Sequence, residues 1–335
     1  MSITAFRHTI ALGELIAGDA PQTLAAEVTL PSPESRGDNP VVLFCFPGGA
    51  MNKAYFNLLL AEGDDVEQFN FARQLARRGC ITIAIDHLGV GDSSKPRDGF
   101  ALTPDIIVAA NQRAVATLLD ALRGGSLTQT LPPLPRLRAI GVGHSMGGML
   151  IALQQAEYRS FDAVAILGFS TRGLPEYVTE PLQPYVHNPE LLRRDLSLLA
   201  RARGDDPYPE LNTRGQAREI YGGGADKRAL QALAAARANL LATMGFMAMM
   251  PGSVAPECAQ IDVPVFLALG DRDMAGSPHA IPASFPACPD ITLQVLPETG
   301  HTHFAFPSCA LLFTRLAHWL REIAPSQSLS EGERA

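Results

Sequence analysis

The sequence has few of the features of an exported, membrane-bound or nucleic-acid-binding protein. Its five cysteines are scattered over 335 residues without CxxC spacing, which argues against a disulfide framework and a zinc site. It has no run of about 18 apolar residues, and its first residues lack a basic segment followed by a long apolar stretch. The formal charge of −7 disfavours nucleic acid and anionic membranes as partners. We therefore expect a cytoplasmic protein with no membrane span, no nucleic-acid partner and no bound metal.

Apolar residues are plentiful, and their pattern predicts an α/β fold. They make up 47% of the chain, against 18% charged residues, which is enough for a large core. Short continuous apolar runs, bounded by Gly, Pro and Asp, predict buried strands at 41–46, 80–85, 137–142, 163–167, 263–269 and 291–296. Helical patterns lie between several of them, at 66–78, 105–123, 146–158 and 309–323. This alternation predicts a parallel sheet covered on both faces. Two alternating segments, 6–12 and 24–30, predict an antiparallel start to that sheet.

The strand pattern stops between residues 171 and 258, where helical stretches at 190–203 and 226–241 take over. We interpret residues 171–258 as a helical cap subdomain inserted into a core domain of residues 1–170 and 259–325. Residues 326–335 are polar and predict a flexible tail. One apolar group in the insertion has two interpretations, as the lining of an acyl pocket or as packing of cap against core. Its members are Met244, Phe246, Met247, Met249 and Met250.

The strongest chemical signal is the sequence Gly-His-Ser-Met-Gly-Gly at 143–148. It follows the predicted strand 137–142 and precedes a helical pattern, which is the setting of a GxSxG nucleophile turn. A serine on such a turn needs strained backbone angles, and the flanking glycines let neighbouring backbone pass close by. We therefore expect Ser145 to be the nucleophile.

A second motif, Phe-Pro-Gly-Gly-Ala at 46–50, leaves the strand 41–46. In acyl transfer a negative charge develops on the carbonyl oxygen, and fixed backbone N–H groups stabilise it. We assign these oxyanion donors to Gly49 and Met146. We expect Ala50 and His144 to line the substrate site, although His144 could instead pack or hydrogen-bond to support the turn.

A nucleophilic serine also needs a base and a carboxylate that orients it. Leu-Gly-Asp-Arg-Asp at 269–273 ends a predicted strand, and we prefer Asp273 over Asp271 because it lies farther beyond the strand. Asp271 could instead cap the turn. Gly-His-Thr-His at 300–303 follows the last strand; we prefer His301 over His303 as the base, because the preceding glycine permits close approach.

These motifs, quoted as FPGGAM, DHLGVGDSS, GHSMGG, LGDRD and ETGH, resemble those of the α/β-hydrolase superfamily, and the resemblance spans residues 41–323. It implies a mostly parallel eight-stranded sheet flanked by helices, with a helical cap inserted after strand six. It also implies a serine hydrolase with the triad Ser145, Asp273 and His301 and no cofactor. Many members have His-Gly where this chain has Pro47 and Gly48. In the DHLGVGDSS motif, His87 has two interpretations, as a contact to substrate and as a structural residue.

The expected activity is cleavage of a carboxylic ester through an acyl-enzyme. The partner would be a small-molecule ester with an apolar acyl or aryl part, and the oligomeric state is left open. Two alternatives remain: hydrolysis of a carbon–carbon bond in a ring-fission diketone, and a ligand-binding relative without catalysis.

Overall fold

An eight-stranded sheet forms the centre of the molecule in the computed structural model, which describes residues 3–16, 18–61, 63, 65–211 and 222–323. The strand order is β1-β2-β4-β3-β5-β6-β7-β8. The strands are β1 (Thr4–Gly13), β2 (Gln22–Leu30), β3 (Val41–Phe46), β4 (Ile81–Ile85), β5 (Arg138–His144), β6 (Ala163–Leu167), β7 (Val265–Gly270) and β8 (Ile291–Leu296). From β4 to β8 all neighbours are parallel, whereas β1 and β2 pair antiparallel and β2 joins β4 antiparallel. The mostly parallel sheet and its antiparallel start are confirmed.

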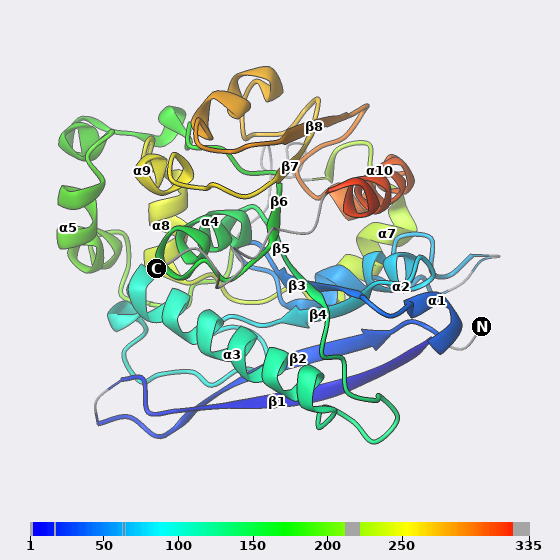
Figure 1. Cartoon of the computed structure of the whole chain (residues 1–335). Helices are drawn as coiled ribbons and strands as arrows, with labels where there is room; N and C mark the ends of the chain where they lie inside the picture. The colour runs from blue at the N-terminus through cyan, green and yellow to red at the C-terminus, as the bar shows by residue number, and fades with distance from the viewer. Residues whose placement is uncertain (1–2, 17, 62, 64, 212–221, 324–335) are drawn as a thin grey trace, which may run out of the picture.

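Helices cover both faces of the sheet (Figure 1). On one face lie α3 (Pro104–Gly124) and α4 (Met146–Tyr158); on the other lie α2 (Phe71–Ala76) and α10 (Cys309–Glu322). Every residue of β3, β4, β6 and β7 is buried, as expected for strands that are covered on both sides. The sheet edge β8 is only half-buried over most of its length.

Three local predictions were wrong in detail. The helix predicted at 66–78 begins only at Phe71, because Asn70 accepts the N–H of Arg73 and caps it there. No helix was predicted between the strands at 24–30 and 41–46, but the chain forms one helical turn there, α1 (Pro33–Arg36), which starts at a proline. The helix predicted at 226–241 is α7 (Lys227–Ala232) followed by the 3₁₀ turn η5 (Leu233–Ala236).

Beyond η5 the chain becomes extended, because it pairs with another part of the molecule. Arg237 has extended backbone angles and forms an antiparallel bridge with Met51, in the loop after β3. The carbonyl of Ala236 accepts the N–H of Asn52, and Ala238 donates to the carbonyl of Ala50. Because the carbonyl of Ala236 and the N–H of Ala238 bond to this loop, they are not available for hydrogen bonds of a helix that continues over 237–241.

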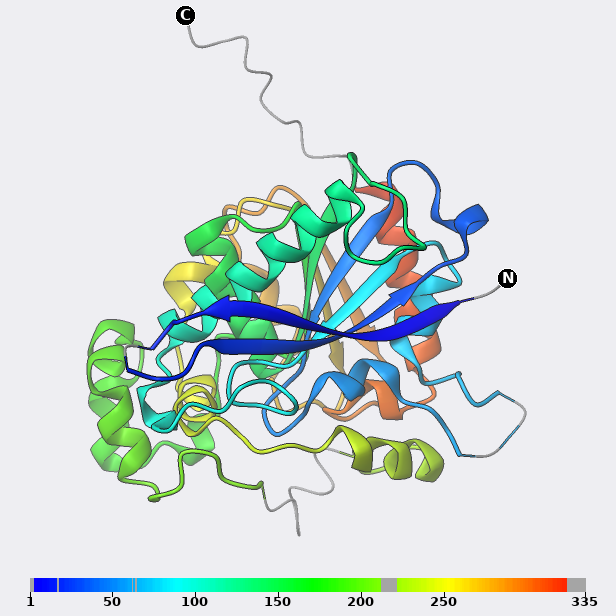
Figure 2. The same cartoon turned by 90° about the horizontal axis from the view of Figure 1, so that it is seen from below.

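The segment between β6 and β7 contains helices but no strand in its described residues. The α-helices in its described residues, besides α7, are α5 (Pro189–Arg201), α8 (Ala242–Met249) and α9 (Ala255–Cys258). In Figure 2 the segment runs along one end of the sheet, with α5 and α7 at opposite sides. Helix α5 packs on α8, which in turn contacts α4. The division into a separate cap subdomain at 171–258 stays a prediction, and the tail 326–335 lies outside the described residues.

Buried residues of the inserted segment join the cores on both faces of the sheet. Those on the α4 side include Leu192, Leu196, Leu241, Met244, Phe246, Met247 and Met250. Those on the α10 side are Ala229, Leu233 and Ala236. Met244 and Met247 are fully buried in this core, a position that favours packing over the lining of an open pocket.

Candidate active site

Ser145 lies on a tight turn between β5 and α4. Its φ of 54° is in the left-handed region that favours glycine. Two glycines make the turn possible: a Cβ on Gly143 would collide with the carbonyl of Gly147, and one on Gly147 would collide with the carbonyl of Phe46. The crowding explains why both flanking positions of the motif lack side chains. The half-buried serine side chain is left accessible beyond the end of the sheet.

A chain of hydrogen bonds links Ser145 to two residues that are far away in the sequence. Ser145 Oγ donates to His301 Nε2 at 2.8 Å, and His301 Nδ1 donates to Asp273 Oδ1 at 2.8 Å. The loops after β7 and β8 carry Asp273 and His301, and the carboxyl ends of these parallel strands lie at the same edge of the sheet as that of β5. The structure thus joins the three residues expected from the motifs in one chain of hydrogen bonds, with His301 in the middle.

The side chain of Asp273 is fully buried, and donors surround its carboxylate. Oδ1 also accepts the N–H of Ala275 at 3.0 Å, and Oδ2 lies 2.7 Å from Nε2 of His303. Burial alone would raise the pKa of the Asp273 carboxyl, but the charges and hydrogen bonds of His301 and His303 outweigh it and hold the pKa well below its usual range. The carboxylate therefore stays ionised at neutral pH.

Asp271 and His303, the alternative residues of the two motifs, make different contacts from Asp273 and His301. Asp271 accepts the N–H groups of Glu298 and Thr299 at 2.9 and 3.0 Å, which matches the turn-capping alternative. His303 bonds to Asp273 rather than to Ser145. This second imidazole on Asp273 was missed by sequence reasoning, and its only signal was the repeated histidine two positions after His301.

The loop after β3 lies beside the serine turn. A Cβ built on Gly49 would come within 4.0 Å of the Met146 side chain, so the two residues expected to supply oxyanion donors are neighbours. Met146 is the first residue of α4, and N–H groups in a first helical turn have no acceptor inside their helix. The positive end of the helix dipole also favours negative charge there.

Buried polar residues hold this loop in place. His87 is fully buried, donates from Nε2 to the carbonyl of Pro47 at 3.0 Å and stacks on Phe46, which favours its structural interpretation. Lys53 follows the loop and pairs with the buried Asp86 at 2.8 Å; Asp86 also accepts the backbone N–H of Lys53 at 2.6 Å. Lys53 and Asp86 were missed from the sequence, where a lone lysine and a strand-ending aspartate 33 positions apart look unrelated.

The two residues expected to line the substrate site differ in exposure. Ala50 is half-buried and has a φ of 59°. His144 is 2% exposed, and its Nε2 donates to the carbonyl of His301 at 2.8 Å. Burial lowers the pKa of His144 well below its usual value, and the charges of His301 and His303 lower it further, so the ring is neutral. This geometry favours support of the turn by His144 over contact with substrate.

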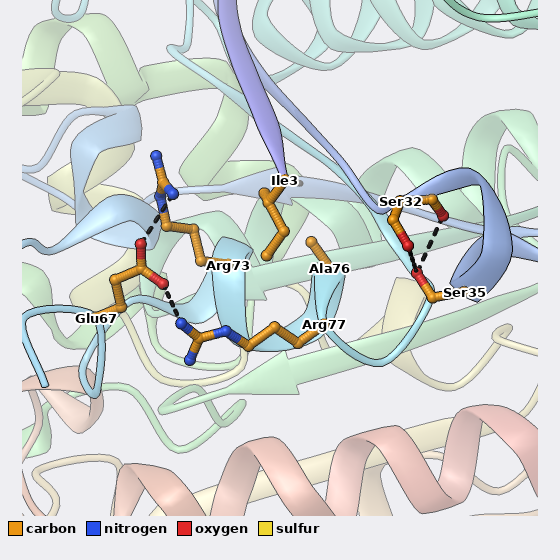
Figure 3. A pocket seen from close by; sticks show the side chains of 7 residues that line it. All are labelled: Ile3, Ser32, Ser35, Glu67, Arg73, Ala76 and Arg77. Atoms are coloured by element: carbon orange, nitrogen blue, oxygen red, sulfur yellow. Dashed lines mark hydrogen bonds and ion pairs between the residues drawn. The ribbon is translucent and has the colours of Figure 1, made fainter. Parts of the chain in front are cut away.

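The described part of the chain holds no cluster of His, Cys, Asp and Glu side chains suited to a metal ion, and none of its helices is long and apolar enough to cross a membrane. A separate hollow lies between the start of β1 and α2 (Figure 3). There Glu67 pairs with Arg73 at 2.9 Å and with Arg77 at 2.5 Å, so its one carboxylate is shared by two guanidinium groups. The residues that line this hollow do not include Ser145, His301 or Asp273.

Comparison with known proteins identifies the fold. A hypothetical protein from Pseudomonas aeruginosa, PA2218, is 18% identical with a TM-score of 0.60, covering 96% of this chain and 94% of that one. A bromoperoxidase from Bacillus anthracis is 16% identical with a TM-score of 0.57, over 95% of this chain and 100% of that one. The thioesterase domain from the curacin biosynthetic pathway is 16% identical with a TM-score of 0.59, over 94% of this chain and 99% of that domain.

At these identities the three structures establish a shared fold and no shared activity. None of the curated proteins compared with the chain matches it by sequence. A family model does match, over residues 42–311, which includes the strand β3, the serine turn and the loops that carry Asp273 and His301. The chain therefore belongs to the alpha/beta hydrolase family.

Proposed function

We propose that the protein is a serine hydrolase that cleaves a small carboxylic ester through an acyl-enzyme. The observation that carries the proposal is the continuous hydrogen-bond chain from Ser145 Oγ through His301 to the buried Asp273. Membership of the alpha/beta hydrolase family supports hydrolysis as the class of reaction. Cleavage of an ester by these residues goes beyond family membership and is our inference.

In this proposal Ser145 Oγ attacks the ester carbonyl while His301 Nε2 takes its proton. Asp273 holds the ring so that Nε2 is the unprotonated nitrogen and stabilises the imidazolium that forms. The negative oxygen would be bound by the backbone N–H groups of Gly49 and Met146, in the loop and helix start that lie together. His301 then returns the proton to the leaving alcohol, and water, activated in the same way, releases the acid.

The surroundings of Gly49 support an apolar acyl or aryl group in the substrate. The Leu240 side chain packs against Gly49, and Met146 lies beside it, so the side-chain atoms nearest to Gly49 are those of two apolar residues. All five cysteines are free thiols, which supports a reducing, cytoplasmic location.

The test is hydrolysis of p-nitrophenyl esters of several chain lengths by wild type and by Ser145→Ala. We expect wild type to turn over at least one ester and the variant to lose about 10⁶-fold in kcat, the loss typical for removal of such a nucleophile. Undiminished hydrolysis by the variant would refute the assignment. Labelling of wild type by a fluorophosphonate probe, absent in Ser145→Ala, provides a readout that does not depend on the choice of ester.

Two outcomes would favour the alternatives. If no ester is turned over while a ring-fission diketone chromophore decays, the same residues cleave a carbon–carbon bond. Ligand binding without fluorophosphonate labelling would point to a binding protein that retains the hydrolase shell.

A further inference from the structure

His303 is a buried imidazole for which the reaction proposed above has no task. It opens the 3₁₀ turn η7 (His303–Ala305), two positions after His301, and its side chain is fully buried. Its Nε2 lies 2.7 Å from Oδ2 of Asp273, the oxygen that His301 does not use. Asp273 thus joins two histidines, one on each carboxylate oxygen.

The direction of the second bond follows from the charge on Asp273. An ionised carboxylate can only accept, so His303 donates from Nε2. The other ring nitrogen, Nδ1, is buried and has no hydrogen-bond partner among the described residues. A buried polar atom left without a partner typically costs about 1–3 kcal/mol.

That orphaned nitrogen argues against a role in packing alone. An apolar side chain of similar size would fill the same space without burying an unsatisfied nitrogen. Compared with such a side chain, the imidazole adds an N–H group that donates to Asp273 Oδ2. Without that donor, Oδ2 would lack this hydrogen bond, and the carboxylate group could rotate about its bond to Cβ.

We propose that His303 is a positioning residue, which donates to Asp273 Oδ2 and thereby holds Oδ1 in line with Nδ1 of His301. This inference rests on the proposed function, because it assigns the task of His303 through the roles of Asp273 and His301 there. A shift of about 1 Å in a reacting group can cost about 10²-fold in rate, so a loosely held carboxylate would reduce turnover while His301 and Ser145 remain in place.

The test compares His303→Gln, whose side-chain amide can donate to Oδ2, with His303→Met, which cannot. The control is His318→Met, because His318 is exposed on α10. Thermal melts and circular dichroism verify folding of each variant. The activity readouts are kcat and KM for the best p-nitrophenyl ester and the rate of fluorophosphonate labelling of Ser145.

We expect His303→Met to lower kcat and the labelling rate by about 10- to 100-fold with little change in KM. His303→Gln should keep both within about 3-fold of wild type, and His318→Met should match wild type. In proton NMR, the far-downfield resonance of the His301 Nδ1 proton should be kept by the Gln variant and broadened or lost in the Met variant.

Two results would overturn the proposal. One is a folded Met variant with wild-type kcat and labelling rate. The other is a folded Gln variant that loses as much as the Met variant, because a donor at the same place would then have no effect. Failure of the proposed function is distinguishable, since it would appear as unchanged activity in Ser145→Ala rather than in the His303 variants.

Discussion

At the scale of a single residue, Ser145 has a strained backbone conformation, and hydrogen bonds from neighbouring elements hold it there. Ser145, a residue with a side chain, holds a φ of 54°, and such strained backbone typically costs about 1–3 kcal/mol. The N–H of Ser145 donates to the carbonyl of Leu167 at 2.7 Å, and its carbonyl accepts the N–H of Met149. These bonds, from β6 and from α4, hold the strained residue in place.

The two aspartates of the LGDRD motif provide a matched pair of variants. We expect Asp273→Asn to lower kcat by about 10⁴-fold, because an amide at this position can hold the base in the wrong tautomer. Asp271→Asn makes the same chemical change two positions away, where the side chain accepts from Glu298 and Thr299 and lies 3.9 Å from Arg272. It should keep kcat within a few-fold and lower the free energy of unfolding by about 1 kcal/mol. Steady-state kinetics and urea denaturation of both variants measure this, and equal losses of kcat would contradict the assignment.

Residues inside a local motif were easier to predict than residues that meet across the fold. Ser145, Asp273 and His301 each follow a strand and stand beside a glycine or a turn, so the sequence around them was informative. The bond from His303 to Asp273 spans 30 positions and depends on how two loops pack. No local pattern contains that information.

At the scale of elements, the loop after β3 is held from two sides. On one side His87 and Asp86, from the loop after β4, bind its backbone. On the other, residues 236–238 of the inserted segment bond to Ala50 and Asn52. The conformation of the proposed oxyanion loop therefore depends in part on the inserted segment, which contributes no strand to the sheet in its described residues.

Leu240 is a side chain of the inserted segment that contacts this loop at Gly49. A Cβ on Gly49 would lie 2.7 Å from Leu240 Cδ1, so truncation of Leu240 should open space beside Gly49. We expect Leu240→Ala to shift the ratio of kcat/KM values for long against short acyl esters by about 10-fold toward the long ones. Leu198→Ala is the control, because Leu198 belongs to the same segment but is 70% exposed. A panel of p-nitrophenyl esters measures the ratio, and an unchanged ratio would place the acyl group elsewhere.

The kind of each core element was predictable, but some boundaries were not. Continuous apolar runs marked the strands because both faces of the sheet are covered. Helical periodicity continued beyond α7, but the pairing of Arg237 with Met51 redirected the chain. Such a tertiary contact overrides local preference.

At the scale of the whole molecule, burial keeps two histidines, His87 and His144, in their neutral form. Burial lowers the pKa of His87 and, more strongly, that of His144 below the usual 6.5. Below pH 6.5 the unfolded chain therefore binds protons that the folded chain does not. The contribution of these two histidines to the free energy of unfolding is therefore fully present above pH 6.5. It is lost progressively as the pH falls toward their folded-state pKa values.

We expect the free energy of unfolding to fall below pH 6.5 by up to about 1.4 kcal/mol per pH unit for each of the two histidines. Urea denaturation at pH 7.5, 6.5 and 5.5 and constant ionic strength measures the slope. His87→Gln removes one of the two groups and should give a shallower slope than wild type, whereas the exposed His318→Gln should not. A wild-type stability that is constant over this range would contradict the expectation.

The distribution of the inserted segment over both cores limits how this enzyme could be re-engineered. Excising residues 171–258 and joining the cut ends would strip apolar cover from opposite sides of the sheet at once, and would remove the backbone that braces Ala50 and Asn52. We therefore expect a version without this segment to lose solubility together with the geometry of the proposed active site. New selectivity must come from exchanging individual side chains such as Leu240, with the scaffold left whole.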